Sequence, residues 1–80
     1  MTMNDDGLHN TIKVLRAMRD YTQADLAERA GTTRKSVNAI ETGRMVPSVL
    51  LALKLARALS VTVDAIFTLT RKTGEEDEVA

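Results

Sequence analysis

The stretch Gln23–Glu41, QADLAERAGTTRKSVNAIE, predicts two short helices joined by a tight turn. Its first helix covers about residues 23–30 and follows Thr22, whose hydroxyl is placed to accept a hydrogen bond from the amide of Asp25. Gly31 comes next, and glycine adopts the left-handed conformation that ends a helix at little cost. The sequence therefore predicts a capped helix followed at once by a sharp reversal of the chain.

The second helix of the stretch covers about residues 34–41 and is capped by Thr33. Val37 and Ile40 give it an apolar face to bury. The opposite face is polar and contains Arg34, Lys35 and Asn38. Two short helices joined by a glycine turn cross at a steep angle, which is typical of a pair whose second helix enters a DNA major groove.

Upstream of this pair, Ile12, Leu15 and Met18 recur at helical spacing and predict an amphipathic helix over about residues 9–20. Residues 1–8 have no periodic pattern, and we expect them to be flexible.

Downstream, Ser48 caps a predicted fourth helix that runs to about Leu59, and Thr62 caps a short fifth helix over residues 63–67. Apolar and polar residues then alternate over residues 66–71, which predicts a short strand. No partner strand is evident in the chain, so we expect this strand to pair across a dimer.

The predicted fold is all-α, a compact bundle of five helices with a short C-terminal strand. At 80 residues the chain makes one domain, expected over residues 9–72, with an acidic, disordered tail at 73–80. The sequence has no cysteine, and its longest apolar run, residues 49–53, is too short to cross a bilayer. Its first residues are polar and acidic, unlike a signal peptide, so the expected location is the cytoplasm.

The charges are distributed unevenly, although the formal net charge is zero. Residues 13–72 contain all 11 Lys and Arg but only five of the 11 acids, an excess of six positive charges. This excess can supply a phosphate-binding face. The remaining acids lie at the two ends of the chain: Asp5, Asp6, Glu75, Glu76, Asp77 and Glu78.

The residues QADLAERAGTTRKSVNAIETGRMVPSVLLALKLARALSVTVDAIF resemble the Xre/Cro-type helix-turn-helix family of phage repressors and small regulators of bacteria and archaea. The resemblance covers about Ile12 to Phe67. It implies a lambda-repressor-like fold and sequence-specific binding to double-stranded DNA. The matching features include Gln23, Leu26-Ala27, Ala30-Gly31, Val37, Ile40-Glu41, Gly43, Pro47-Ser48 and Ile66-Phe67.

This resemblance also implies roles for individual residues. The positions that read DNA bases would be Arg34, Lys35, Asn38 and Ala39. The positions that hold phosphates would be Gln23, Ser36, Thr42, Gly43 (through backbone amides) and Arg44. A largely buried salt bridge between Arg16 and Glu41 would fix the second helix of the pair to the body. Arginine and lysine donate to guanine, and asparagine bonds adenine in a bidentate manner.

One such helix reads only a few base pairs, so we expect a homodimer on a palindromic site with half-sites roughly 34 Å apart. The expected dimer surface is Val63, Ile66, Phe67 and Leu69.

Two functions are compatible with these features of the sequence. The preferred one is a dimeric transcriptional repressor; the alternative is an antitoxin, or another protein-interaction module, whose ends hold a protein partner. We expect no enzymatic activity, because the serines lack an activating base. We also expect no cofactor and no metal, since His9 is the only histidine and has no companion ligands.

Overall fold

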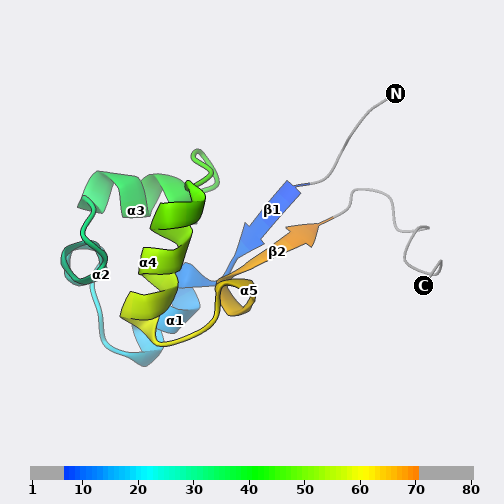
Figure 1. Cartoon of the computed structure of the whole chain (residues 1–80). Coiled ribbons are helices and arrows are strands. Elements are labelled where there is room, and N and C mark those ends of the chain that lie inside the picture. Colours follow the sequence, from blue (N-terminus) through cyan, green and yellow to red (C-terminus); the bar gives the residue numbers. More distant parts are fainter. Residues whose placement is uncertain (1–6, 71–80) are drawn as a thin grey trace, which may run out of the picture.

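The computed structural model describes residues 7–70, which form five helices and two short strands (Figure 1). In chain order the elements are β1 (Gly7–Asn10), α1 (Ile12–Met18), α2 (Gln23–Ala30), α3 (Arg34–Glu41), α4 (Val49–Leu59), α5 (Val63–Ile66) and β2 (Phe67–Thr70). This confirms the predicted five-helix fold and its C-terminal strand. The bounds of α2 and α3 agree with the prediction. Residues 73–80, the predicted tail, lie outside the described residues.

Local hydrogen bonds explain where α2 and α3 begin and end. The Thr22 hydroxyl accepts from the Asp25 amide at 2.9 Å, and the Asp25 carboxylate accepts from the Thr22 amide at 2.9 Å. Gly31 ends α2 in the left-handed conformation, with φ of 73°. The Thr33 hydroxyl then accepts from the Ser36 amide at 3.1 Å. The predicted caps and glycine turn are therefore confirmed.

A core of aliphatic side chains joins the helices, and α2 packs on both α3 and α4. Leu26, Val37 and Leu55 are fully buried within it. The remaining buried residues of the core are Ile12, Ala27, Ala30, Ile40, Ala56, Leu59 and Ile66. A helix of eight residues has little stability alone, so α2 and α3 depend on this packing. The packing also holds the two helices against the rest of the domain.

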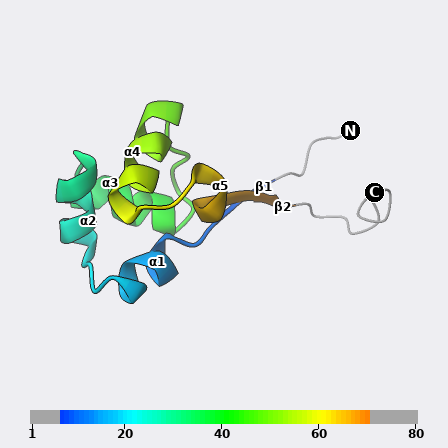
Figure 2. The ribbon, with the colours of Figure 1, turned by 60° about the horizontal axis from the view of Figure 1, so that its bottom comes forward.

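The two strands, one from each side of the helices in the sequence, form an antiparallel two-stranded sheet, in which Leu8 pairs with Leu69 and Asn10 with Phe67. The expectation that the C-terminal strand lacks a partner within the chain was wrong. Gly7 and Leu8 were also expected to be flexible, but both lie in β1. Figures 1 and 2 both show the sheet extending away from the helices.

Several element bounds differ from those predicted. The first helix begins at Ile12 rather than His9, because residues 9 and 10 belong to β1. It ends at Met18, since Asp20 adopts a left-handed conformation with φ of 58°. The fifth helix ends at Ile66, where the backbone of Phe67 becomes extended, and Thr62 precedes it without the predicted side-chain cap bond.

No helix within residues 7–70 has the length and apolar character needed to cross a membrane.

Candidate nucleic-acid interface

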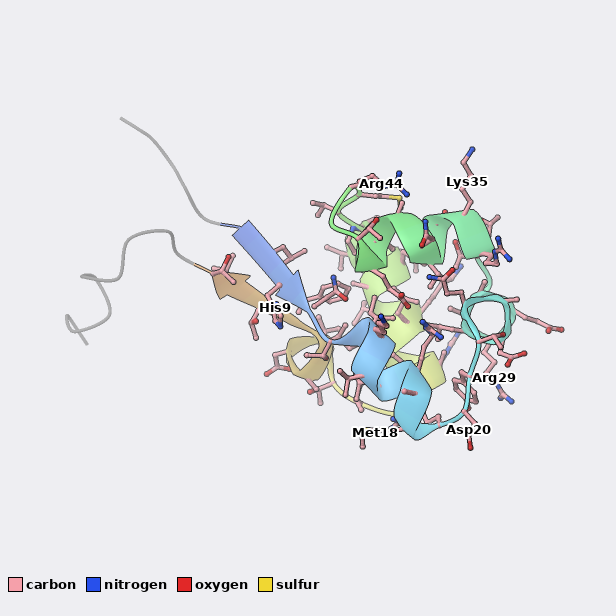
Figure 3. All side chains as sticks on the ribbon, turned by 180° about the vertical axis from the view of Figure 1, so that it is seen from behind. His9, Met18, Asp20, Arg29, Lys35 and Arg44 are labelled. Carbon is pink, nitrogen blue, oxygen red and sulfur yellow. The ribbon has the colours of Figure 1, made fainter. Side chains whose placement is uncertain are left out.

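The N-terminal end of α3 presents two cations to solvent. Arg34 and Lys35 are exposed and make no salt bridge within residues 7–70. Figure 3 shows Lys35 pointing away from the body, on the same side of the molecule as Arg44. Both cations follow directly on the Thr33 cap. The start of α3 is therefore a cationic surface that is free to contact an anionic ligand.

The C-terminal end of α3 is instead fixed by an ion pair between Arg16 and Glu41. The Arg16 Nε donates to Glu41 Oε2 at 2.6 Å, and Nη2 donates to Oε1 at 3.3 Å. The Arg16 Nη1 also donates to the carbonyl of Tyr21 at 2.9 Å. The two side chains are only 15% and 7% exposed. This bidentate pair joins α1 to α3, as the family resemblance implied.

Gln23 extends this ion pair into a network. Its Nε2 donates to Glu41 Oε1 at 3.1 Å and to Asn38 Oδ1 at 3.2 Å. An amide nitrogen has two hydrogens, so both donors of the side chain are used internally. A phosphate is an acceptor, and the Gln23 side chain therefore has no free donor for one in this arrangement. The phosphate role of this side chain stays a prediction, and it requires that Gln23 give up one of these two bonds when DNA binds.

Asn38 and Ala39 lie further along α3 and are both half-buried. The Oδ1 of Asn38 accepts a hydrogen bond from Gln23. The Nδ2 group of Asn38 is therefore the part of its side-chain amide that can donate to a ligand. Arg34 and Lys35 are thus the more accessible of the four residues expected to read bases.

The segment that follows α3 does not offer the backbone amides that the sequence analysis expected. The amide of Thr42 donates to the carbonyl of Asn38 at 3.0 Å, and that of Gly43 donates to Ile40 at 3.1 Å. The hydroxyl of Thr42 also donates to the Asn38 carbonyl at 2.8 Å. These donors satisfy the orphan carbonyls at the end of the helix. The phosphate contacts expected from Thr42 and Gly43 stay a prediction, and they require these internal bonds to be shared or exchanged.

Arg44 and Ser36 retain donors for a phosphate. The Arg44 Nε donates to the Thr42 hydroxyl at 3.2 Å, which leaves the guanidinium Nη atoms of an exposed side chain. The Ser36 hydroxyl accepts from Thr33 at 3.1 Å, and its own proton is left to donate.

The residues expected to form a dimer surface differ in exposure. Ile66 is 1% exposed and belongs to the core, so its predicted interface role was wrong. Val63 and Phe67 are half-buried against the core. Leu69 is 73% exposed, next to its cross-strand partner Leu8 at 40%.

A side-chain hydrogen bond that no sequence pattern indicated ties the sheet to α3. The Asn10 Nδ2 donates to the carbonyl of Ile40 at 3.0 Å, and its Oδ1 accepts from the Ile12 amide at 3.2 Å. A single Asn gives no periodic signal, and its partner lies 30 residues away, so sequence alone could not show this contact.

Comparisons with known proteins agree with this geometry. A family model described as helix-turn-helix matches residues 12–66. YgzD of Bacillus subtilis, named an uncharacterized HTH-type transcriptional regulator, is 47% identical over 62 residues, covering 78% of this chain and 94% of the relative. A regulator of the same description from Methanocaldococcus jannaschii, MJ0272, is 40% identical over 60 residues, covering 75% and 91%.

A solved structure is also similar. The restriction-modification controller protein C.AhdI from Aeromonas hydrophila superposes with a TM-score of 0.65 and 31% identity, covering 68% of this chain and 82% of that one.

Proposed function

The chain belongs to the helix-turn-helix family of DNA-binding transcriptional regulators, and on that premise we propose that α3 reads a specific DNA sequence in the major groove. The observation that supports this most is that Arg34 and Lys35, at the start of α3, are exposed and have no ionic partner among the described residues 7–70. The Arg16–Glu41 pair holds the other end of the helix to the body. An anchored helix with a free cationic start is suited to insertion in a groove.

The base-reading residues of the proposal are Arg34 and Lys35, with Asn38 and Ala39 one turn further on. Arginine and lysine donate to guanine O6 and N7. Asn38 presents its Nδ2 donor, which suits an acceptor such as purine N7 or thymine O4. Ala39 would lie against a thymine methyl group.

Arg44 and Ser36 would bind phosphates on either side of the groove and so fix the register of α3 on the duplex. Figure 3 shows Arg44 and Lys35 on one side of the molecule, so that a single duplex can contact both. This division of roles separates residues that determine sequence preference from residues that determine total affinity.

The proposed regulator is a homodimer that binds a palindromic operator, because one α3 contacts too few base pairs to identify a site in a genome. The simplest regulatory effect of such binding is repression, by occlusion of a promoter.

A fluorescence anisotropy titration tests the proposal. Labelled genomic fragments, including the promoter of the chain's own gene, are compared with random duplexes at two salt concentrations. We expect a fragment bound at least about a thousandfold more tightly than random DNA, and affinity that falls as salt rises. Equal affinity for all fragments would contradict sequence-specific binding.

The antitoxin alternative predicts that a second protein is present when the chain is purified from its own cells. A small basic protein that co-purifies with the chain at a fixed ratio would favour that alternative. Such a complex would still be compatible with DNA binding through α3.

A further inference from the structure

Polar side chains from α1, α2 and α3 form a hydrogen-bond network around Glu41. Arg16 donates to both Glu41 oxygens, at 2.6 and 3.3 Å. The Nε2 of Gln23 donates to Glu41 Oε1 at 3.1 Å and to Asn38 Oδ1 at 3.2 Å. The network therefore connects a buried ion pair to Asn38, a half-buried residue of α3 that is one of the proposed base readers.

The ion pair decides which way each amide of the network is turned. A side-chain amide can be turned end for end with almost no change in shape, which exchanges its donor and its acceptor. A guanidinium has only donors, however, and a carboxylate has only acceptors, so the group of Gln23 that contacts Glu41 must be the nitrogen. The same nitrogen contacts Asn38. Asn38 must therefore direct its carbonyl oxygen toward Gln23.

From this order of donors and acceptors we propose that Gln23 is a positioning residue, which makes Asn38 a hydrogen-bond donor alone toward DNA. This role rests on the proposed function and deepens it by naming the base edge that Asn38 selects. With Oδ1 held by Gln23, Nδ2 is left for the groove, and it donates to no group within residues 7–70. A lone donor suits guanine, through O6 and N7, or thymine, through O4, and does not suit cytosine, whose N4 is itself a donor.

The same orientation disfavours the bidentate contact with adenine that an unrestrained asparagine makes. That contact needs both ends of the amide, with the oxygen accepting from adenine N6 and the nitrogen donating to N7. In this fold the oxygen of Asn38 is directed to Gln23. Adenine then offers a single acceptor beside a competing donor, whereas guanine offers two acceptors. Asn38 should therefore prefer guanine to adenine for as long as Gln23 holds its amide.

Hydrogen exchange of the side-chain amides, followed by NMR without DNA, tests the orientation of Asn38. Rates in the folded wild-type chain are divided by those in the urea-unfolded chain. We expect the Nε2 hydrogens of Gln23 to be slowed about two- to tenfold more than the Nδ2 hydrogens of Asn38, because a hydrogen bond contributes about that factor. Equal slowing, or greater slowing at Asn38, would overturn the proposal.

Selection of duplexes from a random pool tests the consequence for DNA. Comparison of wild type with Asn38→Ala identifies the base pair that Asn38 reads, where wild type should favour guanine or thymine. Gln23→Met keeps the length of the side chain but removes its donors, which frees the amide of Asn38. Adenine should then gain about fivefold or more at this base pair, the least discrimination expected of a bidentate contact.

Ser48→Ala is the matched control for a loss of stability alone. It removes the cap bond of α4, in which the Ser48 hydroxyl accepts from the Leu51 amide at 3.0 Å, and it lies outside the network. We expect Ser48→Ala to keep the wild-type base preference. An equal gain of adenine by Ser48→Ala and Gln23→Met would contradict a positioning role for Gln23.

Other selection results would also overturn the proposal. Wild type could favour adenine, which would mean that Gln23 releases Asn38 when DNA binds. Gln23→Met could keep the wild-type base, or Asn38→Ala could lose preference at no base pair. A wild-type chain that selects no duplex would instead contradict the proposed function, and the exchange rates would still decide how Asn38 is oriented. The exchange measurement also needs no variant, so it decides the orientation even if Gln23→Met fails to fold.

Discussion

The two ends of α3 are built in opposite ways. At the C-terminal end, Glu41 accepts from both Arg16 and Gln23 and is almost buried. At the N-terminal end, Arg34 and Lys35 are exposed and have no ionic partner within residues 7–70. The buried end has the features of a structural anchor, and the free end those of a ligand-binding surface. Substitutions at the two ends should therefore affect different measurements.

The largest expected effect is on stability at the anchored end. Glu41→Ala leaves the guanidinium of Arg16 largely buried without its partner, and we expect a loss of about 3–5 kcal/mol in the free energy of unfolding. Urea unfolding followed by circular dichroism measures this loss. Glu28→Ala, at an exposed residue of α2, is the control and should change stability by less than about 0.5 kcal/mol. Unchanged melting of Glu41→Ala with Arg16 intact would contradict the anchor.

At the free end, the expected effect is on sequence preference. Arg34→Ala should narrow the difference in binding free energy between target and random DNA by about 1–3 kcal/mol, the discrimination expected of one bidentate base contact. Stability should hardly change, because the side chain is exposed. Anisotropy titrations of the two duplexes measure the difference. Lys13 is an exposed cation on α1, and Lys13→Ala should leave the difference in binding free energy between the two duplexes unchanged. An equal effect of Lys13→Ala and Arg34→Ala would refute base reading by Arg34.

Smaller effects should distinguish Arg44, which we propose binds a phosphate, from Gln23, which belongs to the hydrogen-bond network around Glu41. Arg44→Ala should weaken binding to target and random DNA alike and reduce the slope of log affinity against log salt by about 1. Gln23→Ala should instead keep that slope and lower stability by about 0.5–1.5 kcal/mol, the net worth of a typical hydrogen bond. Salt titrations and urea unfolding of both variants make the comparison. A reduced slope for Gln23→Ala would restore a phosphate role to this residue.

The smallest effect concerns pH at the start of α2. Hydrogen bonds from the backbone amide and then the hydroxyl of Thr22 hold the pKa of Asp25 below its ordinary value. A lowered pKa in the folded state stabilises the fold above the ordinary pKa of 3.8, and this contribution is lost as the pH falls below that value. The difference in Tm between wild type and Asp25→Asn should therefore shrink below about pH 4. A difference independent of pH would contradict this account of the cap.

The sequence predicted what depends on near neighbours and missed what depends on distant ones. Thr22, Gly31 and Thr33 act on residues within a few positions of themselves, so the bounds of α2 and α3 could be predicted. The strand Gly7–Asn10 could not, because its four residues have little pattern and their partners, residues 67–70, are far away in the sequence.

The same difference applies within the candidate site. The exposed face of α3 follows from helical spacing, so Arg34 and Lys35 could be predicted to face solvent. The donors of Gln23 and the amide of Gly43 could not be assigned, because their acceptors depend on how α2 meets α3 and how the chain leaves α3.

We propose that the cationic start of α3 selects the DNA sequence, and the selection of bound genomic fragments tests this proposal most directly. Fragments of the source genome bound by the wild-type chain are sequenced and compared with those bound by a variant with both Arg34→Ala and Lys35→Ala. We predict that wild type enriches a palindromic motif and that the double variant, although folded, loses this enrichment. Enrichment of the same motif by both proteins would contradict the account.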